Sequence, residues 1–183
     1  MTGGALVLAA GASRRFGSDK RCFDVDGKPL LCHCLEALAQ AGLATRVCVA
    51  GGETGLVGDL CAIDCEVIEC NDAALGMGAT LAQGVAACED WQQLLVVLAD
   101  MAWVQADTYR ALFAALKESP IVRPSYQGSP GQPVGFSSRF FPELATLQGD
   151  VGGRQLLTQY AQLVHTLPVP DPGVLRDLDR PPA

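Results

Sequence analysis

The first loop of the chain combines small residues and cations in a spacing suited to phosphate oxygens. Residues 8–20 read Leu-Ala-Ala-Gly-Ala-Ser-Arg-Arg-Phe-Gly-Ser-Asp-Lys, and they overlap the end of an apolar run over residues 5–10. Small residues let backbone N–H groups approach phosphates closely. Arg15 can make a forked contact with phosphate, and Lys20 can supply a point charge. The loop lacks the glycine spacing of a P-loop or a dinucleotide fingerprint, and a surface loop with solvated cations is the alternative.

A carboxylate directly follows the most continuous aliphatic run, residues 94–99. If this run is a buried central strand, Asp100 lies at the ligand edge of the sheet. Mg²⁺ takes one or two carboxylates plus substrate phosphates, so Asp100 is a candidate metal ligand; capping of the next helix is the alternative. Asp177 and Asp179, at alternate positions near the end of the chain, can point to the same site, with a frayed acidic terminus as the alternative.

The bulk composition indicates one compact globular domain over residues 1–183. Hydrophobic residues make up 49% of the 183 residues, and no internal repeat or interdomain linker interrupts them. The net charge of -7 argues against nucleic acid as a partner, because a phosphate backbone needs a basic face. The N-terminal apolar run is too short to span a membrane and has no basic segment before it, so we expect a cytoplasmic protein without membrane contact.

The cysteines and histidines offer no catalytic or metal-binding pattern. There are eight cysteines and no Cys-x-x-Cys pair, and neither Cys32 with Cys34 nor the group Cys61, Cys65 and Cys70 has ordinary zinc spacing. We therefore predict free, mostly buried, structural thiols. The two histidines fall inside a predicted helix and a predicted strand, and we expect them to be structural as well.

Short apolar runs alternate with amphipathic segments along the whole chain. The pattern predicts a three-layer, Rossmann-like α/β fold with a mostly parallel sheet and helices on both faces. Ligands in such sheets bind outside the carboxyl ends of the strands, here the loops after Ala10, Gly51, Glu69 and Ala99. The predicted strands are residues 5–10, 46–50, 67–69, 94–99, 120–123, 134–136 and 163–169, and the predicted helices are residues 29–41, 78–88, 106–118 and 152–160.

Six segments, in order along the chain, resemble motifs of the molybdenum cofactor nucleotidyltransferases, a MocA- and MobA-like branch of the NTP transferase superfamily. Asp100 matches the family's metal carboxylate, although Ala99 and Ala102 replace the Gly and Pro that flank it there. The chain also ends at Ala183 without the acidic residues that follow in the family. The matching segments are residues 8–20, 71–84, 98–102, 131–134, 149–154 and 177–181.

The resemblance implies a fold of the nucleotide-diphospho-sugar transferase type and assigns roles to individual residues. Arg15 and Lys20 would hold the triphosphate, Asp100 and Asp179 would bind Mg²⁺, and Asp177 would lie behind these ligands without binding the metal itself. Gly76, Gly78 and Thr80 would border the base or ribose, and Gly131, Pro133, Asp150, Gly152 and Arg154 would face the acceptor. The remaining predicted contacts to the nucleotide are Leu8, Ala9, Ala10, Gly11, Ser13, Gly17 and Asn71.

The implied reaction is attack of an acceptor phosphate on the α-phosphorus of an NTP, with release of pyrophosphate. A phosphate monoester has a second pKa of about 6, so it needs no strong general base. Ala10 narrows the space beside the base and favours CTP, although one methyl group discriminates by only about 1–3 kcal/mol. Molybdopterin is the favoured acceptor, and a molybdoenzyme or its chaperone is a possible partner.

Three other functions stay open on the sequence. The first is a GTP-using molybdopterin guanylyltransferase, and the second is a sugar- or alditol-phosphate nucleotidyltransferase. The third is a non-catalytic nucleotide-binding factor for molybdoenzyme maturation.

Overall fold

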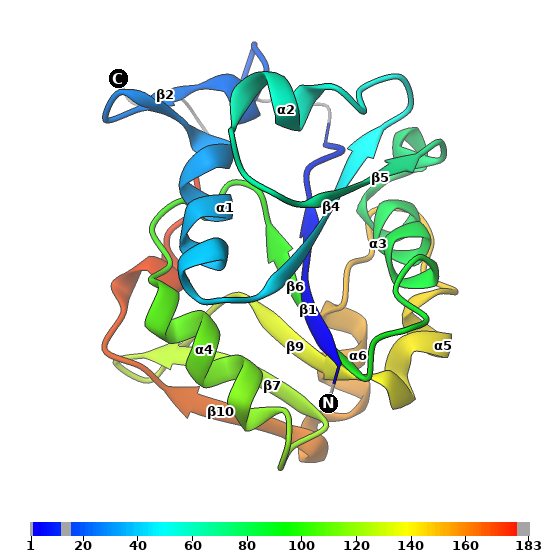
Figure 1. Cartoon of the computed structure of the whole chain (residues 1–183). Helices are drawn as coiled ribbons and strands as arrows, with labels where there is room; N and C mark the ends of the chain where they lie inside the picture. The colour runs from blue at the N-terminus through cyan, green and yellow to red at the C-terminus, as the bar shows by residue number, and fades with distance from the viewer. Residues whose placement is uncertain (1, 12–15, 179–183) are drawn as a thin grey trace.

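A twisted sheet forms the middle layer of the protein in the computed structural model, and helices cover both of its faces (Figure 1). The structure describes residues 2–11 and 16–178. The strand order is β10-β7-β9-β6-β1-β4-β5, with β8 paired to β7 outside this path. The strands are β1 (Gly3–Leu8), β4 (Ala44–Ala50), β5 (Glu66–Cys70), β6 (Gln93–Leu98), β7 (Ile121–Tyr126), β8 (Ser129–Pro130), β9 (Val134–Ser137) and β10 (Val164–Pro168).

The sheet is parallel except at β8 and β9. Strand β1 pairs in parallel with β4 and β6, β4 with β5, and β7 with β10, whereas β9 runs antiparallel to both β6 and β7 and β8 runs antiparallel to β7. This arrangement confirms the predicted three-layer, mostly parallel α/β fold. A two-stranded hairpin, β2 (Asp24–Val25) and β3 (Lys28–Pro29), stands apart from the sheet and was missed because each strand has only two residues.

The described helices lie in two groups (Figure 1). On one face are α1 (Leu30–Gln40) and α4 (Ala106–Ala115), and on the other are α3 (Met77–Ala86), α5 (Phe141–Leu144) and α6 (Arg154–Gln159). The short α2 (Leu56–Leu60) follows β4 and was not predicted. The 3₁₀ turns are η1 (Lys20–Cys22), η2 (Ala73–Leu75), η3 (Ser138–Phe140), η4 (Ala161–Leu163) and η5 (Pro172–Leu175).

Strand β1 contributes side chains to both hydrophobic cores, because successive side chains of a strand point to opposite faces. Ala5 and Val7 pack into the core under α1 and α4, while Leu6 and Leu8 pack into the core under α3, α5 and α6. A strand covered on both faces reads as a continuous apolar run, which is why the sequence shows no alternation there.

Helix α1 shows how the sequence pattern produces the first core. Its leucines at positions 31, 35 and 38 share one face at helical spacing, and all three are buried. The helix packs beside α4, where the thiol of Cys34 lies 3.9 Å from the hydroxyl oxygen of Tyr109. Burial raises the pKa of Cys34 to about 12, so this thiol is a structural group without nucleophilic character at neutral pH.

The prediction of free thiols is wrong for one pair of cysteines. Cys32, in the first turn of α1, forms a disulfide with Cys61, the residue after α2. The two are 29 residues apart in sequence, and only the packing of α2 beside α1 brings them together. Among the other cysteines, Cys22 is exposed, and those that are free and buried are Cys34, Cys48, Cys70 and Cys88.

This disulfide bears on the predicted location, since such bonds are rare in a reducing cytosol. Cytoplasmic location stays a prediction. None of the helices in the described part of the chain combines the length and the apolar character needed to cross a membrane.

The contact between α3 and the sheet depends on a glycine. A Cβ atom at Gly84 would lie 2.5 Å from the Sγ of Cys48 and 2.9 Å from a methyl carbon of Leu6. Both neighbours are buried strand residues, so neither can move without disturbing the core. A helix interior normally prefers Ala over Gly, and packing here overrides that preference.

We expect Gly84→Ala to lower the free energy of unfolding by about 1–3 kcal/mol, because it overpacks this contact. Gly58→Ala in α2 is the matched control, since nothing lies within 4 Å of the added methyl group. The control should raise stability by about 0.5–1 kcal/mol through helix propensity. Urea unfolding of both variants measures the difference, and a neutral or stabilising Gly84→Ala would contradict the packing argument.

Candidate active site

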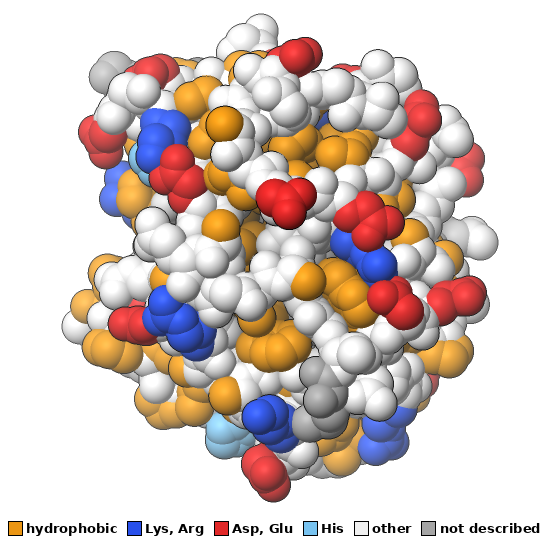
Figure 2. Space-filling model, viewed as in Figure 1, with side chains coloured by type: hydrophobic (Ala, Val, Ile, Leu, Met, Phe, Trp, Pro, Cys, Tyr) orange, Lys and Arg blue, Asp and Glu red, His pale blue; other side chains and the backbone are white. Residues whose placement is uncertain are grey.

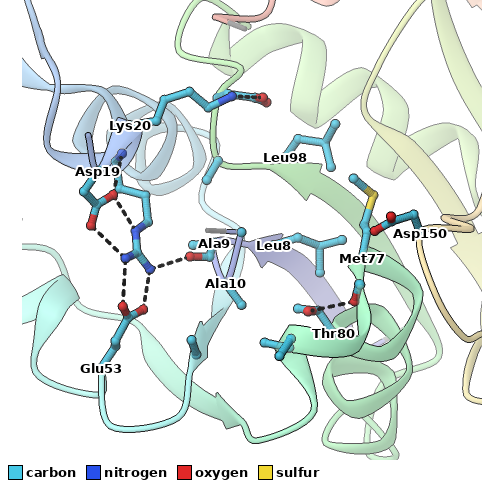
Figure 3. Close-up of a pocket in the computed structure, with 18 of the residues that line it drawn as sticks. Leu8, Ala9, Ala10, Asp19, Lys20, Glu53, Met77, Thr80, Leu98 and Asp150 are labelled. Atoms are coloured by element: carbon cyan, nitrogen blue, oxygen red, sulfur yellow. Dashed lines mark hydrogen bonds and ion pairs between the residues drawn. The ribbon is translucent and has the colours of Figure 1, made fainter. Parts of the chain in front are cut away.

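A cleft of about 980 Å³ opens at the carboxyl ends of β1, β4 and β6 (Figure 3). This is the position at which open α/β sheets bind ligands. The cleft is lined by Leu8, Ala9, Ala10, Gly11, Asp19, Lys20, Arg21, Ala50, Glu53, Ala73, Ala74, Leu75, Gly76, Met77, Thr80, Leu98, Ala99, Asp100 and Asp150.

Lys20 and Asp100 meet in this cleft although 80 residues separate them in sequence. The Nζ of Lys20, at the start of η1, lies 2.7 Å from the Oδ2 of Asp100, directly after β6. Their side chains are only 18% and 17% exposed, so water screens the pair less than it would on the surface. The sequence predicted both residues for the site but did not predict this ion pair.

The second carboxylate oxygen of Asp100 lacks a hydrogen-bond donor among the described residues. Its Oδ1 is buried and has no hydrogen-bond partner among the described residues. Leaving a buried carboxylate oxygen without a hydrogen bond costs free energy. An oxygen left in this state is typical of an atom that binds a ligand or an ion.

The helix-cap alternative for Asp100 fails. Helix α4 begins at Ala106 and its N-cap is Gln105. The backbone N–H of Gln105 donates to Asp171, a buried carboxylate that also accepts from the hydroxyl of Thr108 and the N–H of Gly173. Asp171 is therefore the acid that stabilises the start of α4, and Asp100 is left for the cleft.

A second set of charges lines the cleft on the side of η1, and the sequence analysis missed it. The Arg21 guanidinium donates to Asp19, to Glu53 and to the carbonyl oxygen of Ala9 (Figure 3). Arg21 is buried, and this contact fixes the backbone just after β1. The close spacing of Asp19 and Arg21 was a weak indication that the two side chains pair. Glu53 lies after β4, and none of its sequence neighbours indicates that it belongs to the same cluster.

The same cluster shifts three pKa values. Hydrogen bonds from Arg21 hold the pKa of Asp19 and that of Glu53 below their ordinary values. The hydrogen bond to Asp19 is also the main reason that the pKa of Arg21 is raised. All three groups are therefore charged at neutral pH.

Two predicted segments meet on the opposite side of the cleft. Gly76 has a φ of 118°, and a Cβ there would lie 2.4 Å from the carbonyl carbon of Gly149, so only glycine fits. The N–H of Gly78 donates to the carbonyl oxygen of Gly149 at 2.7 Å. The hydroxyl of Thr80 donates to the carbonyl oxygen of Gly76 at 3.4 Å, and Asp150 enters the lining.

The remaining predicted site residues fall into two groups. Ser13, Arg15 and Asp179 lie outside the described residues, so their roles stay predictions. Others are described but do not line the cleft, and their roles also stay predictions. Gly131, for example, donates its N–H to the carbonyl oxygen of Pro124 and packs against Val174. The described residues outside the lining are Gly17, Asn71, Gly78, Gly131, Pro133, Gly152, Arg154 and Asp177.

The charges on the surface are mixed in sign. On the face shown in Figure 2, Lys and Arg side chains are scattered among Asp and Glu side chains. Arg46, for example, is paired with both Glu66 and Asp90. The sheet, the cleft at its carboxyl edge and the Lys20–Asp100 pair are typical of α/β proteins that bind a ligand at the ends of their strands, and they suit an anionic ligand such as a nucleotide.

Comparison with known proteins gives the family. The model of the MobA-like NTP transferase domain matches residues 5–164, and the chain belongs to this family. The purine catabolism protein PucB of Bacillus subtilis is 31% identical over 188 residues, which cover 96% of this chain and 91% of PucB. A probable molybdenum cofactor guanylyltransferase of Pyrococcus horikoshii is 49% identical over 45 residues, or 25% of this chain and 23% of that protein.

Solved structures agree with this placement. Rv0371c from Mycobacterium tuberculosis H37Rv superposes with a TM-score of 0.87 at 28% identity, covering 98% of this chain and 93% of that one. A structure of Rv0371c in complex with manganese gives a TM-score of 0.77 at 25% identity, covering 92% and 89%. The fold is that of the nucleotide-diphospho-sugar transferases, and the chain is a nucleotidyltransferase.

The Arg21 cluster predicts a dependence of stability on pH. The pKa values of Asp19 and Glu53 are lower in the folded state than their ordinary values of 3.8 and 4.5. Their contribution is complete above those ordinary values and is lost as pH falls through the lower folded values. Glu53→Gln should therefore lose less stability between pH 7 and pH 3.5 than the wild type. Urea midpoints at both pH values measure this, with the exposed Glu118→Gln as control. A wild-type pH response in Glu53→Gln would contradict the assignment.

Proposed function

We propose that this nucleotidyltransferase transfers CMP from CTP to the phosphate of molybdopterin and releases pyrophosphate. The observation that carries the proposal is the Lys20–Asp100 pair at the carboxyl edge of the sheet, with one oxygen of Asp100 unpaired. A cation and an available carboxylate at one point of a cleft suit a triphosphate with its divalent metal.

The residues present fit a magnesium ion. The described residues hold no group of three or more His, Cys, Asp or Glu that could form a closed metal site. Mg²⁺ needs no such group, because it takes one or two carboxylates and completes its shell with phosphates and water. Asp100 would supply one oxygen, and Asp179 remains the proposed second ligand. The manganese complex of the mycobacterial relative supports a divalent ion in this fold. When bound, the metal supplies positive charge that stabilises the phosphates.

The chain's own residues have to align the reactants and balance charge. An oxygen of the acceptor phosphate forms a bond to the α-phosphorus, and the bond from that phosphorus to the pyrophosphate oxygen breaks. Lys20 lines the cleft and can donate to phosphate oxygens there. Arg21 holds the carbonyl of Ala9 in place and so fixes the backbone that the phosphates approach. The attacking phosphate is already largely dianionic, so a general base is not needed.

The choice of base rests on Ala10. Ala9 and Ala10 are both buried and line the cleft, and the methyl group of Ala10 would narrow the space beside the base. This supports the smaller pyrimidine of CTP. The archaeal relative is named a guanylyltransferase, so GTP is the second candidate.

Molybdopterin is proposed as the acceptor from the family, with a molybdoenzyme or its chaperone as partner. The name of the Bacillus relative places that protein in purine catabolism, and this supports a partner enzyme in a catabolic pathway.

We expect Asp100→Asn to reduce turnover by at least about 100-fold, because the carboxylate charge is a main source of electrostatic stabilisation. The melting temperature should fall through loss of the Lys20 ion pair, but the protein should stay folded, since the side chain keeps its size and does not cap α4. Pyrophosphate release from CTP and from GTP, each with isolated molybdopterin, measures turnover. Normal turnover by Asp100→Asn would place the metal elsewhere.

We expect Lys20→Ala to weaken nucleotide binding by at least tenfold, because it removes a cation from the phosphate end of the cleft. Lys28→Ala is the matched control. It also removes a lysine that is paired with a carboxylate, Glu36, but Lys28 does not line the cleft. Calorimetric titration with Mg-CTP measures both. Equal affinities of the two variants for Mg-CTP would show that Lys20 does not bind the nucleotide.

The acceptor assignment has its own test. Pyrophosphate release without any preference among acceptors would exclude molybdopterin as the specific acceptor.

A further inference from the structure

We propose that Leu75, Met77 and Val151 form an apolar rim that binds the fused heteroaromatic ring of the acceptor. The proposal rests on the proposed function and adds the residues that select the acceptor. The three side chains are 67%, 43% and 45% exposed, unusually high for large hydrophobic residues. Single exposed hydrophobic side chains are normal, but a cluster at the edge of a cleft indicates a ligand surface.

The rim is held together by the close contact between its two segments. Leu75 and Met77 flank Gly76, and both line the cleft. The backbone oxygen of Val151 would lie 2.7 Å from a Cβ at Gly78, and the Sδ of Met77 would lie 3.2 Å from one at Gly152. The loop over residues 149–152 therefore packs directly on residues 76–78. The left-handed φ of Gly76 is part of the backbone path that leaves its two neighbours exposed.

The rim lies across the cleft from Lys20 and from the cluster of Asp19, Arg21 and Glu53. Figure 3 shows Met77 and Asp150 beside each other on one side, with Lys20 and Glu53 on the other. The cleft thus has one side whose cations, together with a divalent metal, would suit phosphates, and another side where exposed apolar side chains stand beside one carboxylate, Asp150, and suit a ring. A phosphate monoester with an attached ring system would place one part at each end.

The chemistry of the rim favours a ring over a polyol. The hydroxyl groups of an alditol phosphate lose water when they enter a cleft and need hydrogen-bonding partners in return. The side chains of Leu75 and Met77, which line the cleft, and of the neighbouring Val151 provide none, whereas a flat ring can pack against apolar side chains. The thioether of Met77 is polarizable and makes favourable contacts with aromatic rings. Asp150, which also lines the cleft, can accept hydrogen bonds from ring N–H groups or from hydroxyl groups, so the preference for a ring rests on the apolar side chains.

The test is equilibrium binding of two phosphate monoesters to the whole chain. One probe is a fluorescent pterin with a phosphorylated side chain, and the other is ribitol 5-phosphate. Both are titrated with Mg²⁺ and a CTP analogue that has a methylene group between the α and β phosphates, so that no turnover occurs. Fluorescence anisotropy reports the pterin, and calorimetry reports ribitol phosphate and the CTP analogue.

We expect the wild type to bind the pterin phosphate at least tenfold more tightly than ribitol phosphate. Met77→Ser and Leu75→Ser should each weaken pterin binding by about tenfold, equivalent to about 1.4 kcal/mol. Both should leave the affinity for the CTP analogue within about twofold. Leu175→Ser is the matched control, because Leu175 is 45% exposed, close to the 43% of Met77, but does not line the cleft; it should change neither affinity.

Three results would overturn the proposal. The first is equal affinity of the wild type for the two phosphate monoesters, and the second is unchanged affinity for the pterin phosphate in both rim variants. The third is a loss of affinity for the CTP analogue as large as that for the pterin phosphate, which would assign the rim to the nucleobase. Failure of the proposed function looks different. In that case pterin binding would still depend on the rim, but the wild type would release no pyrophosphate from CTP or GTP with molybdopterin.

Discussion

The parallel pairing of β1 with β6 is the constraint on which the site depends. The register places Leu8 opposite Leu98, so the two strands end at the same level. The first loop of the chain follows β1 and Asp100 follows β6, and both strands are buried in the cores on either side of the sheet. The position of Lys20 relative to Asp100 thus follows from backbone pairing and burial, and the ion pair adds a specific contact to an arrangement already set by the core.

Charged contacts then fix the positions of the loops at the cleft, which strand pairing alone does not fix. Arg21 joins the end of β1, through Ala9, to Glu53 on the loop that follows β4. The partners compensate one another in a mostly buried position, where an unpaired guanidinium would be costly. On the other side of the cleft the join is made without charge, by glycines that let residues 76–78 and 149–151 touch. One wall is rigid through ion pairs and the other through close backbone packing.

This difference between the walls is reflected in their chemistry. The charged wall suits phosphates, which vary little among nucleotidyltransferase substrates. In the proposed arrangement, the apolar side chains of the opposite wall would meet the acceptor, which is the part of the substrate that does vary. A fold that keeps its charged groups at the ends of central strands and its variable side chains on connecting loops can change acceptor without disturbing the phosphate site.

The sequence alone determined the layers and the strand that precedes Asp100, because burial on both faces leaves continuous apolar runs that can be read locally. It also pointed to the first loop, of which residues 8–11 and Lys20 line the cleft. It did not determine the contacts between distant segments. The Cys32–Cys61 disulfide, the Glu53–Arg21 pair, the role of Asp171 at α4 and the Leu75–Met77–Val151 rim each join residues from different elements. Local periodicity carries no information on which loops lie side by side. Only the order and register of the strands, set by tertiary packing, decided which charged residues share a cleft and which hydrophobic residues stay exposed at its edge.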